Sequence, residues 1–298
     1  MRIGKAMALS RRTLTLALAL TPGIGGKTVT RALTRNDLLG RSPDDFLRIG
    51  PEALREEYGM KVKVADTWHA RKKAMVAEAK QVEERLVPLG VSLVTAADAH
   101  YPRRIEQMDA DPPGVLFLYG NTKLLESQSA CVLSSRGTDR KGLEAVERLA
   151  EEHVLNGKAI VSGHDTPEYQ RSAVVPLRYG APRLLVLDRG LFKALGEELQ
   201  DEPFRAARLW RYKFDAKTDL ALSSLNPEKD FHPNSNRVRD RLIAALSLSL
   251  DFVAVRKGGN METLAKSALR CGRPVRVYEK AEAAEHLQSL GAQAFYLD

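Results

Sequence analysis

The segment ACVLSSRGTDRKG combines side chains and backbone features that bind phosphate. An apolar run ends at Ser135, Arg136 and Gly137, and the pattern predicts a helix soon after them. Hydroxyl groups, free amides at a helix start and a guanidinium fork all bind phosphate oxygens. In the alternative interpretation the segment is a surface turn in which Arg136 pairs with Asp139.

A second such junction lies in KAIVSGHDTPEYQ, where Ser162 and Gly163 end another apolar run. These two residues would lie beside Ser135 if the two strands are neighbours in a parallel sheet. His164 and Asp165 are residue types that carry acid–base catalysis, but adjacent residues rarely face the same way and no third partner stands out. We identify no convincing catalytic constellation and expect a binding protein that is not an enzyme.

The segment FHPNSNRVRDRLIAALS places Arg237, Arg239 and Arg241 at the start of an apolar helix. Positive charges at this position oppose the helix dipole, so an external anion is their simplest counter-charge. A solvated helix face is the alternative interpretation.

Lys257, Gly259 and Asn260 lie in a turn before the following helical pattern. Glycines permit close approach of the backbone to a phosphate, and they equally suit an ordinary strand-to-helix turn. The pattern alone favours neither interpretation.

Near the N-terminus, LTPGIGGKTVTRAL has the spacing of a helix-hairpin-helix motif, in which Gly23 and Gly25 allow a tight turn. Lys27 and the amides at the start of the second helix would then contact a DNA phosphate. A phosphate-binding P-loop needs a glycine where Thr21 stands, so we reject that interpretation. A turn that only packs two helices is the alternative.

The charge balance agrees with a polyanionic partner. The 298 residues include 46 Lys and Arg against 38 Asp and Glu, a formal net charge of +8. This excess favours nucleic acid through counterion release but does not single it out. Cys131 and Cys271 lack the spacing of a zinc site or a disulfide framework. We expect no metal and no cofactor.

The N-terminus superficially resembles a signal peptide, because Arg2, Lys5, Arg11 and Arg12 precede the apolar residues 14–20. The apolar stretch runs directly into PGIGGK, however, without a small-residue cleavage pattern. No later window approaches the roughly 20 apolar residues of a membrane span. We therefore expect a cytoplasmic protein that does not enter a membrane.

Short helical patterns fill residues 1–64, which we assign to a small all-helical domain of the helix-hairpin-helix (SAM-like) type. Residues 65–90 form one long amphipathic pattern that Pro88 and Gly90 terminate, and we expect this helix to bridge two domains. The second domain then covers residues 65–298.

Beyond the bridging helix, apolar runs rich in β-branched residues alternate with helical patterns. The runs lie at 91–95, 114–120, 130–135, 158–163, 183–188, 219–224, 251–255 and 274–279. The helical patterns lie around 138–154, 168–179, 200–212, 235–249 and 261–271. This alternation predicts an α/β fold with a Rossmann-like, doubly wound, mostly parallel sheet, in which ligands bind beyond the carboxyl ends of the strands.

The order of the motifs resembles the DNA-processing (DprA/Smf) family. YPRRIEQMDADPPGVLFLYGN is similar to that family's opening segment, SSR to its Gly-Ser-Arg and IVSG to its Val-Val-Ser-Gly. RDRLIAALS is similar to its Arg-Asn-Arg-Ile-Ile-Ala-Gly-Leu-Ser, and residues 259–275 resemble its Ser-Gly-Ser…Ala…Gly-Arg-x-Val block. The resemblance covers roughly residues 14–35 and 91–279 in colinear order.

This resemblance implies a Rossmann-like domain of the SMF/LOG superfamily that binds single-stranded DNA and forms a homodimer. It also implies hand-over of the strand to a RecA-like recombinase in DNA uptake or recombination. Arg136 falls on the family's DNA-contacting arginine, and Arg239 and Arg241 fall on its second basic motif. The chain departs from the pattern where Ser134 replaces a glycine and Asp240 an asparagine, which puts these roles in doubt.

Two rival functions stay open. A sensor that binds a nucleotide-like signal, in a mobile-element or defence setting, is favoured because HDTPEYQRSA keeps none of the polar landmarks of its family counterpart. A nucleotide phosphoribohydrolase of the same superfamily is the second rival, since GGNMET faintly resembles a Gly-Gly-x-Gly-Thr…Glu loop. Met261 and Glu262 stand where that loop has its glycine and threonine, so the match fails at the phosphate cradle.

Overall fold

The computed structural model describes residues 8–96 and 98–297, so Arg2 and Lys5 of the basic N-terminal pattern lie outside the described residues. The chain divides into two compact units. The first comprises Met1–Tyr101 and Asp111–Leu116, and the second comprises Pro102–Ala110 and Phe117–Asp298. No helix among the described residues is long and apolar enough to span a membrane.

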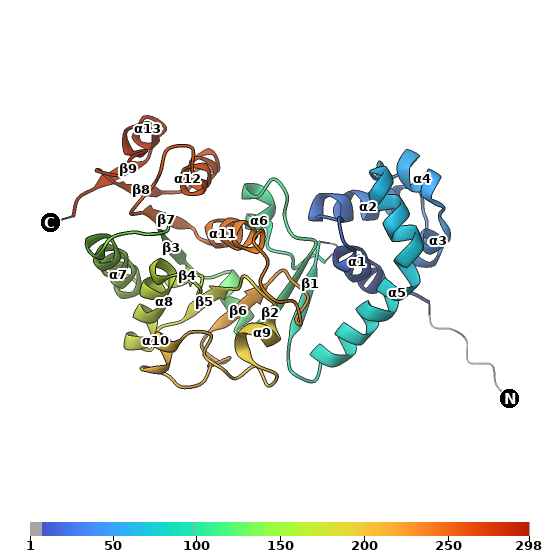
Figure 1. The fold of residues 1–298 in the computed structure, drawn as a ribbon, viewed down its shortest axis with the longest axis horizontal. Helices are drawn as coiled ribbons and strands as arrows, with labels where there is room; N and C mark the ends of the chain where they lie inside the picture. Colours follow the sequence, from blue (N-terminus) through green and yellow to red (C-terminus); the bar gives the residue numbers. More distant parts are fainter. Residues whose placement is uncertain (1–7, 97, 298) are drawn as a thin grey trace. The chain divides into compact units, whose positions relative to one another are not determined.

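The first unit is mainly helical. It contains α1 (Arg11–Leu20), α2 (Gly26–Leu38), α3 (Pro43–Arg48), α4 (Pro51–Glu56), α5 (Val62–Leu86) and strand β1 (Ser92–Thr95) (Figure 1). Ser10 caps α1, and Ser42 with Asp45 forms a capping box on α3. The long helix α5 packs along α1 and α4, and its Trp68 is fully buried beside Phe46. The predicted bridging helix thus belongs to the core of the first unit, and a separate domain at 65–298 stays a prediction.

The described residues form one nine-stranded sheet in the order β1-β2-β6-β5-β4-β3-β7-β8-β9. The strands after β1 are β2 (Val115–Gly120), β3 (Ser129–Leu133), β4 (Ala159–Ser162), β5 (Arg183–Val186), β6 (Leu220–Ser223), β7 (Ser249–Phe252), β8 (Val275–Tyr278) and β9 (Gln293–Phe295). Strand β2 pairs antiparallel with β6, and every pairing from β6 to β9 is parallel. The predicted doubly wound, mostly parallel α/β fold is confirmed.

Helices cover both faces of the second unit's sheet. They are α6 (Arg103–Met108), the 3-10 helix η1 (Thr122–Leu125), α7 (Arg140–Leu155), α8 (Pro167–Tyr179), α9 (Leu191–Leu195), α10 (Arg205–Arg208), α11 (Ser235–Leu246), α12 (Asn260–Arg270) and α13 (Ala284–Ser289). Helices α7 and α8 pack on each other, as do α11 and α12 (Figure 1). Because right-handed crossovers run outward in opposite directions from β3 and from β7, these two pairs lie on opposite faces.

The strand order reverses between β3 and β7, which are hydrogen-bonded neighbours. The chain leaves β3 toward α7 on one face and leaves β7 toward α12 on the other. Loops that diverge in this way open a crevice at the carboxyl edge of the sheet, where doubly wound folds bind their ligands. The topology therefore predicts a ligand site at the β3–α7 and β7–α12 loops.

One predicted helix differs from the structure, and the structure contains short elements that were not predicted, β9 among them. The helix predicted at 200–212 is mostly wrong, because only Arg205–Arg208 is helical and an isolated β-bridge joins Asp201 to Lys213 on either side of it. Strand β9 was not predicted, since a three-residue, partly exposed edge strand carries too little alternation to detect.

Candidate nucleic-acid interface

The β3–α7 loop is fastened to the end of β7. Ser135 N donates to Ala254 O at 2.8 Å, and Ala254 N donates to Ser134 Oγ at 3.1 Å. Gly137 takes a φ of 79°, a left-handed conformation that a side chain would strain. These constraints leave Arg136 at the tip of the loop, where 62% of its side chain is exposed.

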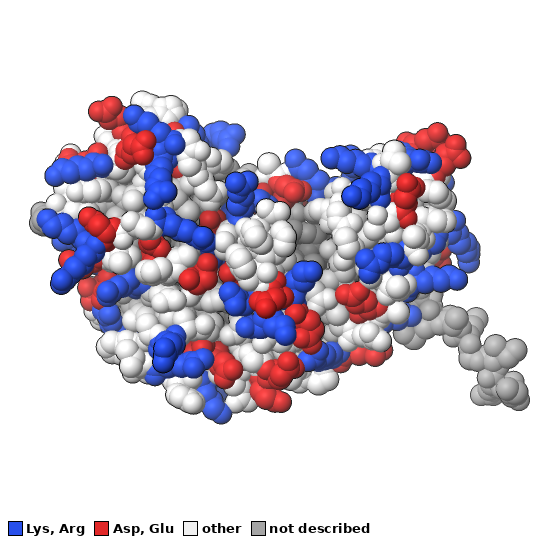
Figure 2. Space-filling model, in the orientation of Figure 1, with Lys and Arg blue, Asp and Glu red and all other residues white. Residues whose placement is uncertain are grey.

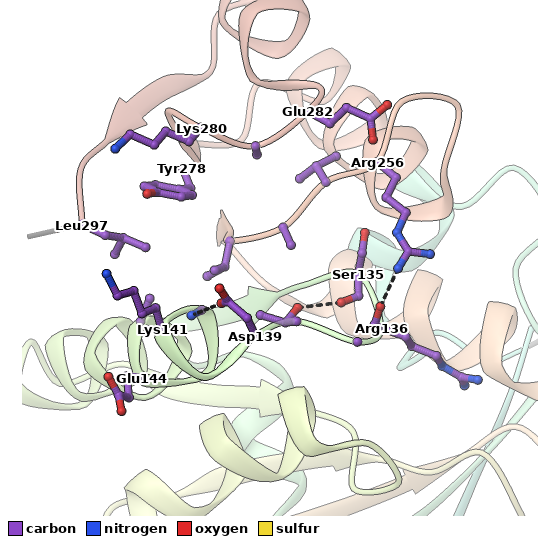
Figure 3. A pocket seen from close by; sticks show the side chains of 18 of the residues that line it. Ser135, Arg136, Asp139, Lys141, Glu144, Arg256, Tyr278, Lys280, Glu282 and Leu297 are labelled. Atoms are coloured by element: carbon purple, nitrogen blue, oxygen red, sulfur yellow. Dashed lines mark hydrogen bonds between the residues drawn. The ribbon is translucent and has the colours of Figure 1, made fainter.

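The guanidinium of Arg136 is only loosely paired. It lies 3.8 Å from Asp165 Oδ2, beyond hydrogen-bond distance. The backbone of Arg136 is held more firmly, because its carbonyl accepts a hydrogen bond from Arg256 Nη2 at 2.8 Å (Figure 3). A fixed backbone with a loosely paired guanidinium suits an external anion.

The amides of this loop face a carboxylate of the protein itself. Glu168 Oε1 accepts from Gly137 N at 2.9 Å and from Thr138 N at 3.2 Å, and Glu168 is only 4% exposed. The sequence predicted that free amides at this turn would hold a phosphate. That expectation is not met, because Glu168 from the first turn of α8 already occupies them.

Ser162 and Gly163 support neighbouring side chains and are buried. Ser162 Oγ donates to Tyr169 O at 3.0 Å and lies 2.8 Å from Ser172 Oγ. A Cβ on Gly163 would lie 3.0 Å from the Tyr169 ring and 3.1 Å from Arg239 Nη1. A side chain at position 163 would therefore force Tyr169 or Arg239 to move by a few tenths of an ångström.

Arg239 belongs to the interior of the second unit. It is 1% exposed, stacks on the Tyr169 ring at 4.5 Å from the centroid, and bonds to Asp165 and Asp240. Burial acts to lower the pKa of Arg239, but Tyr169 and the two carboxylates outweigh it and raise the pKa above its usual value. The expected external counter-charge is thus replaced by internal ones.

The other two arginines of this helix lie nearer the surface. Arg237 is exposed, whereas Arg241 is partly buried and donates from Nε to Asp109 Oδ2 at 2.9 Å. Of the three arginines singled out from the sequence, Arg237 is therefore the one whose side chain is most open to solvent.

The β7–α12 loop repeats the pattern of an internal carboxylate on a glycine amide. Glu262 Oε2 accepts from Gly258 N at 2.5 Å. The pKa of Glu262 is lowered by its hydrogen bond to Lys266 and by this amide. Asn260 Nδ2 donates to Asp240 Oδ2 at 2.8 Å. Arg256 and Lys257 are exposed cations of this loop.

Two hollows flank the β3–α7 loop, and Arg136, Gly137 and Thr138 line both. The larger, here called the switch-point pocket, measures about 770 Å³ and extends over the ends of β7 and β8. The smaller, here called the side pocket, measures about 440 Å³ and extends toward Asp188 and Phe231. Arg136 therefore lies on the ridge between two hollows.

Basic side chains and one aromatic ring line the switch-point pocket. Its cations are Arg136, Lys141, Arg148, Arg256 and Lys280, against Asp139, Glu144 and Glu282. Figure 3 shows Tyr278, Lys280 and Leu297 across the hollow from the β3–α7 loop. On the face shown in Figure 2, a column of Lys and Arg side chains runs over the part of the second unit where β7 and β8 lie. An aromatic ring within a basic hollow suits an unpaired base with its phosphates.

His164 and Asp188 form a buried polar pair near these loops. His164 Nε2 lies 3.2 Å from Asp188 Oδ1. Burial would raise the pKa of Asp188, yet His164 and Arg189 lower it well below its usual value. Within residues 8–96 and 98–297, no group of three His, Cys, Asp or Glu residues is placed to hold a metal ion.

In the first unit, the PGIGG turn also faces a carboxylate. Gly23 has a φ of 84°, Gly25 caps α2, and Lys27 N lies 3.4 Å from Asp111 Oδ1. A Cβ on Gly26 would overlap the Pro112 carbonyl at 1.4 Å, so this glycine serves packing. The turn joins α1 to α2, and Asp111 lies beside an amide that a phosphate would need, so the helix-hairpin-helix phosphate contact stays a prediction.

A sequence model of the DNA recombination-mediator protein A family matches residues 92–295. The chain belongs to this family. DNA processing protein A (DprA) from Streptococcus pneumoniae is 17% identical, with a TM-score of 0.71 over 97% of this chain and 95% of that one. DNA processing protein A from Helicobacter pylori, whose structure was described for a unique single-stranded DNA binding mode, is 20% identical, with a TM-score of 0.53 over 68% and 90%.

These likenesses show a shared fold, and family membership supports a role in DNA processing. No curated protein sequence matches the chain. The family model and the two structures confirm the resemblance inferred from the order of the motifs.

Sequence reasoning missed Glu168, Arg256 and Tyr278. Glu168 follows Thr166 and Pro167 at a typical helix start, where a carboxylate is expected, but nothing in the sequence indicates its partner 31 residues earlier. Arg256 and Tyr278 each follow or end a predicted strand at the carboxyl edge. The rule that ligands bind at this edge would have identified both.

Proposed function

We propose that this member of the DNA recombination-mediator protein A family binds single-stranded DNA at the carboxyl edge of its sheet. One observation carries the proposal: Arg136 is exposed and loosely paired on the ridge between two hollows. A strand that crosses this ridge would place a phosphate on Arg136 and a base in the switch-point pocket. Arg237, Arg256 and Lys257 are exposed cations of the neighbouring elements.

The biological role that we propose is protection of single strands and loading of a RecA-like recombinase, with a homodimer as the working form. Family membership supports this role, and so does the single-stranded DNA binding described for the Helicobacter pylori relative. We also propose a cytoplasmic location, in keeping with that role.

A sensor of a nucleotide-like signal is the second candidate, because the switch-point pocket has the volume of a small-molecule site. The internal carboxylates argue against it. Glu168 and Glu262 occupy the loop amides that would cradle the phosphate of a mononucleotide. The same argument weakens the phosphoribohydrolase alternative.

The two candidates separate in a binding comparison. We expect the full chain to bind a fluorescent 30-nucleotide dT strand more tightly than a duplex of equal length, and to bind AMP or cyclic dinucleotides weakly. Anisotropy titration for the strands and calorimetry for the nucleotides measure this. Tighter binding of a mononucleotide than of the strand would replace the single-strand proposal with the sensor.

A further inference from the structure

A short segment of the second unit exposes large apolar side chains next to cations. Leu209 is 85% exposed, Trp210 51% and Tyr212 79%. We call these three residues the aromatic ridge. They follow α10 directly, and α10 packs against α8 (Figure 1). Large exposed apolar groups that are contiguous in this way mark an interaction surface.

Buried side chains and a buried ion network anchor the backbone beneath the ridge. Phe204, Ala207 and Phe214 are buried and anchor both ends of the segment. A buried ion network fixes it further: Arg183, fully buried, bonds to Glu202 at 2.5 Å and to Asp219 at 2.7 Å.

Arg211, between Trp210 and Tyr212, bonds to the same two carboxylates. The alternate residues Trp210 and Tyr212 are thereby turned outward while Arg211 points into the network. A ridge that is held in place before binding costs little entropy on binding.

Three cations close to the ridge in the sequence, Arg205, Arg208 and Lys213, form no described ion pair, whereas Arg211 pairs with Glu202 and Asp219. Arg208 donates to the Glu202 carbonyl at 3.2 Å, and Lys213 Nζ donates to Gln200 Oε1 at 2.8 Å. Arg205 is exposed and forms no described ion pair. Three positive charges without a described acidic partner therefore lie within a few residues of two exposed aromatic rings.

We propose that the aromatic ridge is a second contact surface for single-stranded nucleic acid. Unpaired bases would stack on Trp210 and Tyr212, while Arg205, Arg208 and Lys213 contact phosphates. Stacking on aromatic rings between cations is the way proteins bind single strands without sequence preference. A duplex hides the faces of its bases, and a second copy of this chain would bring like charges together, so neither fits this surface.

The ridge lies at the far end of α8 from the candidate interface. Glu168 is in the first turn of α8, whereas Arg178 in its last turn stacks on the Trp210 ring at 5.3 Å. The 13 residues of α8 span about 20 Å. If the proposed function holds, a strand long enough to cross this distance would reach both surfaces. Stacking on the ridge does not depend on that condition.

The fluorescence of Trp210 reports this binding directly. The chain has two tryptophans, and Trp68 is fully buried in the first unit. We expect dT30 to quench the exposed tryptophan, and Tyr212→Ala to weaken the quenching titration by about 5- to 150-fold per lost base stack. Leu290→Ala, an exposed apolar position on the distant α13 side, is the matched control and should change nothing.

Anisotropy and melting temperature are measured in the same samples. If dT30 is bound by anisotropy but tryptophan emission stays constant at saturation, the ridge is not a single-strand surface, and a protein partner becomes the better occupant. Equal quenching in the Tyr212→Ala variant, with an unchanged melting temperature, contradicts the proposal too. Quenching that persists in Arg136→Ala supports the ridge even where the Arg136 site fails.

Discussion

The carboxylate of Glu168 lies 2.9 Å from the backbone nitrogen of Gly137, in the position that a phosphate takes when the turn before a helix binds one. The Glu168 carboxylate thus occupies the loop amides that could otherwise bind a phosphate. A phosphate at this edge of the sheet must be held by exposed side chains instead. This relationship favours a polymer, whose phosphates meet several scattered cations, over a mononucleotide.

Removing Glu168 should uncover the cradle. We expect Glu168→Ala to lower the free energy of unfolding by about 1–3 kcal/mol, because two loop amides lose their acceptor. Millimolar phosphate should restore part of the lost melting temperature in the variant and leave wild type unchanged. Glu168→Gln, which keeps an acceptor oxygen, is the control and should respond to phosphate little. A variant that is insensitive to phosphate would show that the cradle is only a packing contact.

Salt dependence should reveal the number of phosphate contacts. The log–log slope of strand affinity against salt should be about −0.7 for each contacted phosphate. Loss of one contact in Arg237→Ala should reduce the slope by about 0.7, since Arg237 is an exposed cation of α11. Anisotropy at four salt concentrations measures this. A wild-type slope near zero would exclude an electrostatic interface.

Arg239 should matter for folding more than for binding. Arg239→Ala leaves Asp165 and Asp240 without their buried counter-charge, so we expect a loss of about 3–5 kcal/mol in the free energy of unfolding. Arg239→Lys should not recover it, because an ammonium lacks the planar fork and the stacking on Tyr169. Urea denaturation decides the matter. A stable variant that has lost DNA binding would instead place Arg239 in the interface.

Acid should weaken the second unit through Asp251. Burial opposes the shift, but hydrogen bonds from Arg276 and His153 lower the pKa of Asp251 below its usual value. A carboxylate with a lowered pKa stabilises the fold fully above its unfolded pKa, about 3.9, and loses that contribution as pH falls toward the folded value.

The free energy of unfolding should therefore decline more steeply below pH 4 in wild type than in Asp251→Asn, which starts lower. Urea curves between pH 7 and pH 3 measure both. Parallel pH profiles for the two proteins would show that the loss of stability in acid does not come from Asp251.

The sequence was sufficient for elements whose pattern is local. Eight strands and the helices at α7, α8, α11 and α12 could be placed within a few residues because their apolar period is set by their own residues. The prediction failed at 200–212 because residues outside this segment bond to its side chains: Arg183 pairs with Glu202 and Asp219 pairs with Arg211.

The candidate site shows the same division. Arg136 follows a strand and could be singled out from that position alone. The burial of Arg239 depends on Asp165, 74 residues away, and the occupied cradle depends on Glu168, 31 residues from Gly137. A periodic pattern in the sequence does not indicate contacts between residues so far apart along the chain.

Replacement of Arg136 tests the central claim most directly. Affinity for dT30 and melting temperature are compared in wild type, Arg136→Ala, Arg136→Lys and Arg140→Ala, an exposed arginine on the first turn of α7 that pairs with Glu144. We predict that Arg136→Ala loses about 10- to 150-fold in affinity at an unchanged melting temperature, that Arg136→Lys recovers part of it, and that Arg140→Ala binds like wild type. Wild-type affinity in Arg136→Ala, or a loss shared equally by Arg140→Ala, would contradict the account.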